Sequence, residues 1–300
     1  MKWGKSRMKQ FMGVYPPVVT VFTNGGEIDS IKTSRFMHYL IEQGIHGLFV
    51  GGSTGEASLM TPEQRKQIIQ IGIEVARGRL PVLAGTGCNG TKMTIELSRY
   101  AQDTGADGVV VSMPHYPKPD QQAIYEHYRA IKQEIGIPLF IYNYPDQYGV
   151  DIDPETVARL AWEGLIQGIK DTHVDLDHTL EIIRLAGDRM TVWQGFDSKL
   201  FSALCLGASG GIFTLANIIP REMVSIYQSF QEARWEDARQ QQFKIMGLVG
   251  ALSRRHDMQL LKEGLKMLGH DVGDALMPTS RVPDELIEAL RDELTKLGLI

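Results

Sequence analysis

Short runs of apolar residues alternate along this chain with longer segments whose apolar positions recur at helical spacing. The runs predict eight strands, at residues 17–22, 47–50, 81–85, 108–112, 138–142, 166–170, 190–194 and 210–213. Several runs contain few polar residues, which is typical of parallel strands that are buried on both faces. Eight strands alternating with helices predict an α/β fold, a (β/α)8 TIM barrel.

Helix start signals lie between the runs. Thr61, Pro62 and Gln64 form an N-cap, a first-turn proline and a capping-box glutamine. Residues 153–155 (DPE) predict another helix start in the same way. The alternative architecture, an open doubly wound sheet, usually carries a glycine-rich phosphate fingerprint after its first strand. Residues 20–26 (TVFTNGG) do not contain one.

The chain continues beyond the eighth run with helical patterns and no clear strand. Residues 283–299 place five leucine and isoleucine side chains at helical spacing. No flexible linker precedes this part of the chain. We therefore expect a flexible N-terminal tail at 1–12, the barrel at 13–230, and a C-terminal helical extension at 231–300 packed on the barrel within one domain.

Composition narrows the possible classes of protein. The 300 residues carry a net charge of −5, which argues against a nucleic-acid partner. No apolar run approaches the ~20 residues that span a bilayer, and the basic N-terminus lacks the apolar core of a signal peptide. We expect a cytoplasmic protein without a membrane partner. Cys88 and Cys205 lie far apart, which predicts free, buried thiols rather than a disulfide or a zinc site.

Lys170 directly follows an apolar strand, in the sequence GIKDT. Catalytic groups of such barrels lie at the C-terminal strand ends, where burial would lower the pKa of the lysine amine. A neutral amine attacks carbonyl groups to form a Schiff base. The competing interpretation is an ion pair between Lys170 and Asp171, and position alone leaves the two interpretations about equal.

Two further strand ends carry candidate chemistry. Tyr142 ends the fifth run, where its hydroxyl would be able to transfer protons to an imine, although a core tyrosine is the commoner case. The turn at 52–56 (GSTGE) offers hydroxyls and successive backbone N–H groups that suit a carboxylate. This signal alone is weak, because glycine-rich turns are common after strands.

The acidic and histidine residues at 171–178 match no calcium-loop pattern. We interpret this segment as a solvated helix start. Neither the segment nor the other histidines predict a metal site, and no cofactor motif is present.

Together these motifs resemble those of the dihydrodipicolinate synthase/N-acetylneuraminate lyase family of class I pyruvate-type aldolases. The resemblance runs from about residue 13 to the C-terminus. It includes GSTGE at 52–56, YNYP at 142–145, GIKDT at 168–172 and GFD at 195–197. Four motifs in the right order and at strand ends make the resemblance specific for the family.

The resemblance implies a role for each residue. Lys170 would form the Schiff base, Tyr142 would relay protons, and Tyr116 would reach into a neighbouring subunit's site. A second set would bind substrate: Ser53, Thr54, Gly55, Gly195 and Ile212. Gln147 and Asp197 are added as groups able to bind the hydroxyls of a sugar acid. The substrates would be pyruvate and an aldehyde, without metal or cofactor, in a homotetramer built as a dimer of dimers.

Gln147 bears on the choice of aldehyde. Dihydrodipicolinate synthases carry an arginine at this position, which binds the carboxylate of the second substrate. A glutamine lacks that charged fork but can bind hydroxyl groups. The sequence therefore slightly favours an aldolase for 2-keto-3-deoxy sugar acids. The alternatives are 4-hydroxy-tetrahydrodipicolinate synthase, a metal-dependent barrel aldolase, and a non-catalytic regulatory barrel that binds keto acids.

Overall fold

The computed structural model describes residues 11–255 and 258–300. The predicted tail at 1–12 therefore lies outside the described residues except for its last two. Of these, Phe11 is only 2% exposed and lies inside the barrel, where its carbonyl accepts a hydrogen bond from Trp193 Nε1 at 2.8 Å. The barrel thus begins with a residue that fills one end of its interior.

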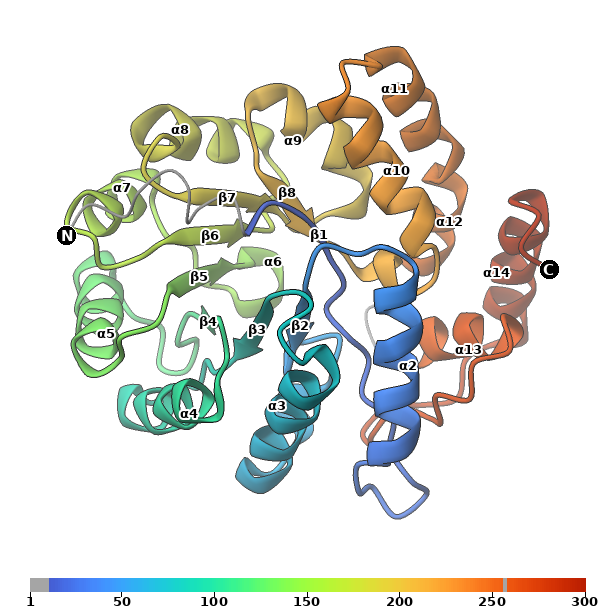
Figure 1. Cartoon of the computed structure of the whole chain (residues 1–300), viewed down its shortest axis with the longest axis horizontal. Helices are drawn as coiled ribbons and strands as arrows, with labels where there is room; N and C mark the ends of the chain where they lie inside the picture. Colours follow the sequence, from blue (N-terminus) through green and yellow to red (C-terminus); the bar gives the residue numbers. More distant parts are fainter. Residues whose placement is uncertain (1–10, 256–257) are drawn as a thin grey trace.

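Eight parallel strands form a single sheet that curls into a nearly closed barrel (Figure 1). In chain order the strands are β1 (Gly13–Tyr15), β2 (Leu48–Val50), β3 (Val82–Gly85), β4 (Gly108–Ser112), β5 (Leu139–Asn143), β6 (Gly168–Asp171), β7 (Thr191–Gln194) and β8 (Gly210–Ile212). β1 pairs with β8, and each later strand pairs with the next. A bridge between Pro17 and Phe49 joins the remaining edges. The predicted TIM barrel is confirmed.

The first strand lies earlier in the chain than the sequence predicts. β1 is Gly13–Tyr15, whereas the apolar run at 17–22 leads out of the barrel. Pairing with β2 goes on past β1 only as the bridge at Pro17, where Val18 N donates to Phe49 O at 2.8 Å. Beyond it the ladder ends, because the amides of Val19 and Val21 donate to side chains instead. The residues of the run remain buried, with Val19 fully inaccessible, which explains their apolar pattern.

Helices cover the outside of the barrel. They are α2 (Ser30–Glu42), α3 (Pro62–Ala76), α4 (Thr91–Thr104), α5 (Gln121–Glu134), α7 (Pro154–Trp162), α8 (Leu176–Ala186), α9 (Leu200–Leu206) and α10 (Pro220–Gln231). The short helix α6 (Pro145–Tyr148) instead follows the C-terminal end of β5. The predicted capping box of α3 is present, with Thr61 and Gln64 bonded reciprocally. Both predicted proline starts are also confirmed, because Pro62 is the first residue of α3 and Pro154 is the first residue of α7.

Two apolar cores stabilise this arrangement. The larger lies between the sheet and the helices. The smaller fills the barrel interior and is largely aromatic, with Phe11, Tyr15, Phe49, Phe140, Tyr142 and Trp193 among its members. Trp193 and Phe140 rings approach to 4.8 Å between centroids. A filled interior gives rigid strand ends on which a site can be built.

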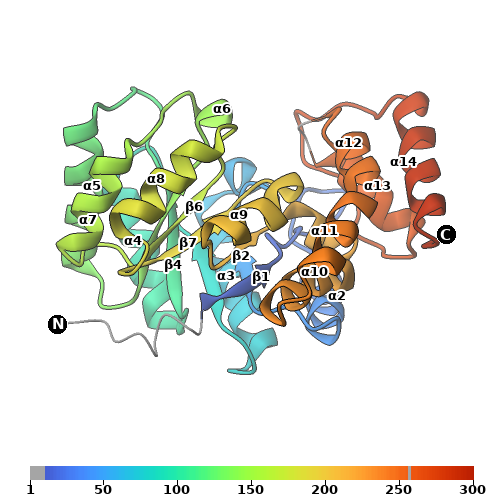
Figure 2. The same ribbon diagram turned by 90° about the horizontal axis from the view of Figure 1, so that it is seen from above.

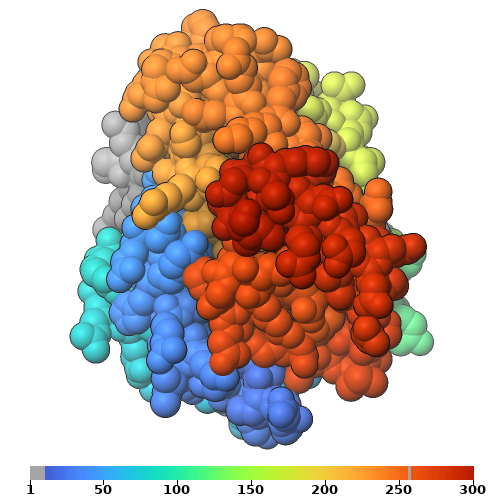
Figure 3. Space-filling view, turned by 90° about the vertical axis from the view of Figure 1, so that its right-hand side faces the viewer, coloured from blue at the N-terminus to red at the C-terminus, as the bar shows by residue number. Residues whose placement is uncertain are grey.

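The C-terminal part is helical, with α11 (Trp235–Lys244), α12 (Met246–Leu252), α13 (Gln259–Met267) and α14 (Asp284–Lys296). Seen from above, α12, α13 and α14 gather at one side of the barrel (Figure 2). In the space-filling view they lie against the N-terminal part of the chain, drawn in blue, and α10–α11, drawn in orange (Figure 3). The assignment of 231–300 to the barrel's own domain stays a prediction. Within the described residues, no helix is long and apolar enough to span a membrane.

Candidate active site

Lys170 and Tyr142 lie side by side at the C-terminal ends of β6 and β5. They are register partners on the two neighbouring strands. The Lys170 Nζ atom lies 4.1 Å from the centroid of the Tyr142 ring. The two residues that the sequence singles out are therefore brought into direct contact at the end of the barrel where such enzymes act.

The environment of Lys170 favours its neutral amine. The residue is 5% exposed, and burial lowers its pKa to about 7, against the opposing charge of Asp197. Asp171 points to the other face of the strand, where its carboxylate accepts hydrogen bonds from Asn143 Nδ2 at 3.0 Å and Thr179 Oγ1 at 2.6 Å. The interpretation of Lys170 as the ion-pair partner of Asp171 is therefore wrong.

The lowered pKa gives a testable pH profile. We expect the rate of iminium formation with pyruvate to rise with pH through about 7 and to level off above it, because the protonated amine cannot attack. The measurement is the initial rate of borohydride trapping as a function of pH, followed by mass spectrometry. A midpoint near the ordinary lysine value of 10.5 would contradict this expectation.

Tyr142 is held with its hydroxyl beside the GSTGE turn. Its Oη lies 3.3 Å from Ser53 Oγ, at hydrogen-bond distance. Burial raises the pKa of Tyr142 to about 12, although the hydrogen bonds of Ser53 and Thr172 act in the opposite direction. The phenol is therefore protonated at neutral pH and can both donate a proton and receive one back.

The turn after β2 presents hydroxyl groups, but only part of its row of amides is free. The amides of Gly55 and Ala57 both donate to Gly52 O, and that of Glu56 donates to Ser53 O. These three N–H groups are therefore not available to an anion as the sequence suggests. Ser53 Oγ faces Tyr142, and Thr54 Oγ1 lies 3.4 Å from Thr214 Oγ1. The groups that can receive a carboxylate are therefore these hydroxyls and the successive amides of Ser53 and Thr54, which donate to no described residue.

The turn after β7 lies against Lys170. A Cβ atom on Gly195 would come within 1.8 Å of Thr172 Oγ1 and 3.0 Å of Lys170 Cε, so only glycine fits. Asp197 Oδ1 accepts from the Leu215 amide at 2.8 Å. Burial raises the pKa of the Asp197 carboxyl to about 6, against the effects of the Leu215 amide and of Lys170. Ile212 is fully buried in the barrel interior.

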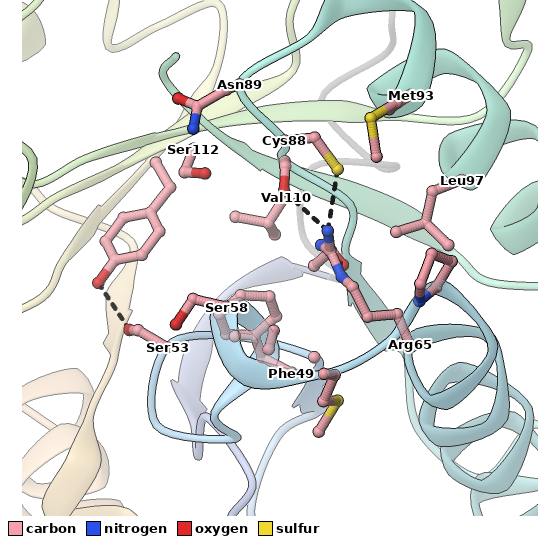
Figure 4. A pocket seen from close by; sticks show the side chains of 18 of the residues that line it. Phe49, Ser53, Ser58, Arg65, Cys88, Asn89, Met93, Leu97, Val110 and Ser112 are labelled. Carbon is pink, nitrogen blue, oxygen red and sulfur yellow. Dashed lines mark hydrogen bonds between the residues drawn. The ribbon is translucent and has the colours of Figure 1, made fainter. Parts of the chain in front are cut away.

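A cavity of about 590 Å³ opens beside Tyr142 and runs outward between α3 and α4. Ser53, Tyr142 and Gln147 line it, whereas Lys170, Thr54, Gly55, Gly195, Asp197 and Ile212 do not. Arg65 and Cys88 line it farther out, and Ser112, the register partner of Tyr142, lines it at the end of β4 (Figure 4). The cavity is large enough for a second substrate next to an imine on Lys170.

Tyr116 is not brought to this site within one chain. It is 82% exposed, and it is absent from the residues that line the cavity. Its neighbour His115 does line the cavity and stacks on Tyr148 at 5.3 Å between ring centroids. Entry of Tyr116 into a neighbouring subunit's site, and the homotetramer, stay predictions.

Arg65 is a site residue that the sequence analysis missed. Its guanidinium donates to Gly85 O, Gly87 O and Cys88 Sγ, each at 3.0 Å. Its buried Nε has no hydrogen-bond partner. In the sequence Arg65 is an ordinary charged residue on a helix, and no local signal distinguishes it. The fold alone turns this fixed positive charge towards the cavity.

The acidic and histidine segment is only partly a solvated helix start. Asp175 caps α8, as expected, but Asp171 is fully buried and accepts from His178 Nδ1 at 3.1 Å. Burial alone would lower the pKa of His178, but the hydrogen bond and charge of Asp171 raise it to about 9. In the described part of the chain, no three His, Cys, Asp or Glu side chains are placed to hold a metal.

The cysteines are free but not buried. Cys88 is half-buried at the cavity wall and Cys205 is exposed. Cys205 lies on α9, whose inward face is formed by Leu200, Ala203 and Leu204. The apolar stretch that predicts a buried thiol therefore belongs to a helix with Cys205 on its outer side.

Comparison with known proteins extends over almost the whole chain. The model of the "Dihydrodipicolinate synthetase family" matches residues 10–297. A 4-hydroxy-tetrahydrodipicolinate synthase from Syntrophus aciditrophicus is 36% identical over 97% of this chain and 99% of its own length. The corresponding enzyme of Thermotoga maritima is 32% identical over 97% of this chain and 100% of its own.

Solved structures give the same result. A crystal structure of dihydrodipicolinate synthase superposes with a TM-score of 0.93 at 34% identity, covering 97% of this chain and 100% of that one. A prophage protein of the same family from E. coli K12, in complex with pyruvate, has a TM-score of 0.92 at 32% identity, with 97% and 99% covered. The synthase of Acinetobacter baumannii, also with pyruvate, scores 0.93 at 33% identity, with 96% and 99% covered.

Proposed function

This chain belongs to the dihydrodipicolinate synthetase family and is a lyase of the class I aldolase type, and from this premise we propose that it is a 4-hydroxy-tetrahydrodipicolinate synthase. It would condense pyruvate with aspartate semialdehyde. The relatives named above support this function better than the sugar-acid aldolase that Gln147 favours. The observation that carries the proposal is Arg65, which gives the cavity a fixed positive charge although position 147 lacks one.

The proposed reaction starts from the Lys170–Tyr142 pair. The neutral Nζ of Lys170 adds to the C2 carbonyl of pyruvate, and Tyr142 supplies the proton with which the hydroxyl leaves as water. Ser53 and Thr54 hold the pyruvate carboxylate through their hydroxyls. The resulting iminium accepts electrons when a proton leaves C3, and an enamine forms.

The enamine then forms the new carbon–carbon bond. Its C3 attacks the aldehyde carbon of the second substrate, whose oxygen receives a proton. The α-amino group of the semialdehyde attacks C2 and displaces Lys170, which closes the ring and releases the amine. Arg65 would bind the carboxylate of the semialdehyde, and Gln147 would donate a second, uncharged hydrogen bond.

Arg65 gives the test of this function. We expect purified protein to condense pyruvate with aspartate semialdehyde, and Arg65→Met to lower kcat/KM for that aldehyde about 10- to 100-fold, because a charge-assisted hydrogen bond is worth roughly 1.5–3 kcal/mol. With glyceraldehyde, which has no carboxylate, the same variant should change kcat/KM less than threefold. The measurement is steady-state kinetics with both aldehydes.

Lys66→Met is the matched control, since Lys66 lines the same cavity but is engaged over the Tyr100 ring at 5.6 Å. Gln147→Arg should raise activity with the semialdehyde further and leave glyceraldehyde unchanged. The sugar-acid aldolase is the second candidate, and Gln147 favours it because an amide binds hydroxyls. If the wild-type protein has a higher kcat/KM for glyceraldehyde than for aspartate semialdehyde, it is the sugar-acid aldolase and not the synthase.

A further inference from the structure

A buried ion pair connects the C-terminal helices to the active-site turn. Lys262, on α13, is fully inaccessible, and its Nζ lies 2.6 Å from Oε1 of Glu56, which is also buried. Glu56 is the last residue of the GSTGE turn, directly after Ser53, Thr54 and Gly55. The two partners are separated by most of the chain, so only the folded C-terminal part brings them together.

Glu56 holds the turn in an unusual shape. Its backbone lies in the left-handed region, with a φ of 63°, which is unfavourable for a residue other than glycine. Its amide donates to Ser53 O at 2.9 Å, and its second carboxylate oxygen accepts from the Leu276 amide at 2.6 Å. Both oxygens of one side chain are therefore held by the C-terminal part, and this fixes the strained residue that ends the turn.

Lys262 is fixed in turn by its own surroundings. Its Nζ donates to Asp274 O at 3.0 Å and lies 4.9 Å from the centroid of the Phe22 ring. Burial lowers the pKa of Lys262, against the opposing charge of Glu56. Burying two charges is expensive, and an apolar pair of the same size is often no less stable. Stability alone is therefore a poor explanation for an ion pair at this place.

We propose that Lys262 is a positioning residue for pyruvate binding, acting through Glu56 on the Ser53 and Thr54 hydroxyls. The ion pair sets the conformation of Glu56, and Glu56 sets the position of Ser53 through its amide. Ser53 in turn faces Tyr142 at 3.3 Å. The inference rests on the proposed role of these hydroxyls as the carboxylate site.

The test is Lys262→Met, which keeps the length of the side chain and removes its charge. We expect the pyruvate concentration that gives half-maximal borohydride trapping to rise about tenfold or more, because the carboxylate site is no longer held in place. The maximal trapping rate should change less than threefold, because Lys170 does not contact the ion pair. This split between half-saturation and maximal rate is a readout that a loss of stability alone would not produce.

Lys266→Met is the matched control. Lys266 lies one turn later on α13 and pairs with Glu263 and Asp274 at the surface, so its loss should leave pyruvate half-saturation unchanged. The double variant Glu56→Gln/Lys262→Met removes both charges and should regain stability over Lys262→Met, by thermal melting. It should retain the weakened pyruvate binding, because the turn still lacks its anchor.

The proposal is overturned if either folded variant, the single or the double, binds pyruvate within twofold of wild type. Failure of the proposed function is seen separately, in the wild type. A wild-type protein that forms no trapped pyruvate adduct refutes the Schiff-base site itself. A wild-type protein that traps pyruvate but does not use aspartate semialdehyde leaves the role of Lys262 intact.

Discussion

Lys170→Met is expected to abolish the covalent adduct that pyruvate and borohydride form with the wild-type protein, and to lower turnover by about 10⁴-fold or more. Mass spectrometry of the intact protein should show one reduced pyruvate per wild-type chain and none in the variant. The reason is geometric as well as chemical. Lys170 is a buried amine with a pKa lowered to about 7, in contact with the ring of Tyr142.

Lys132→Met is a suitable control for that experiment. The pKa of Lys132 is also lowered by burial, but its Nζ donates to Ile137 O between α5 and β5, away from the C-terminal strand ends. The variant should keep the full adduct and near-normal turnover. An adduct that persists in Lys170→Met would place the Schiff base on another lysine.

The second large effect is expected at Tyr142. Tyr142→Phe should lower turnover by ~10²-fold or more, because it removes the proton donor beside the imine. The melting temperature should fall by only a few degrees, since the hydroxyl makes hydrogen bonds of ordinary strength, to Ser53 and Thr172. Steady-state kinetics and thermal melting of the same sample give both quantities.

Tyr128→Phe separates proton transfer from burial. Tyr128 is a fully buried tyrosine whose hydroxyl donates to Val111 O at 2.9 Å, on the side of β4 that faces α5. Its phenylalanine variant should lose stability to a similar extent and keep its turnover. If the two variants were equally active, Tyr142 would be a packing residue.

The sequence predicts the barrel well because its signals are local. Alternating apolar runs and capping residues depend only on neighbours in the chain, and strand ends are where barrel enzymes place chemistry. Lys170 and Tyr142 follow directly from that rule. The first strand is misplaced because residues 17–22 are all buried but join the ladder only through the bridge at Pro17. An apolar pattern indicates burial rather than hydrogen bonding.

Arg65 and Lys262 are missed by the sequence analysis because their roles depend on contacts between distant parts of the chain. Arg65 and Lys262 are charged residues on amphipathic helices, and most such residues point to solvent. Arg65 reaches the strand ends of β3, and Lys262 meets a glutamate more than two hundred residues earlier. Lys262 does carry a weak signal in the sequence, because it directly follows the largely apolar residues 258–261 (MQLL).

The close fit of Gly195 against Lys170 and Thr172 has a consequence for evolvability. No side chain can be added there without displacing Thr172 and crowding the Lys170 side chain, so the half of the site that handles pyruvate leaves little room for mutation. The opposite wall is built from the four-residue helix α6 and from side chains of α3 and α4, which meet the open cavity. We expect that variants with new aldehyde specificities can be selected from libraries in which only residues of that wall are mutated. Such variants would keep the reaction of Lys170 with pyruvate unchanged.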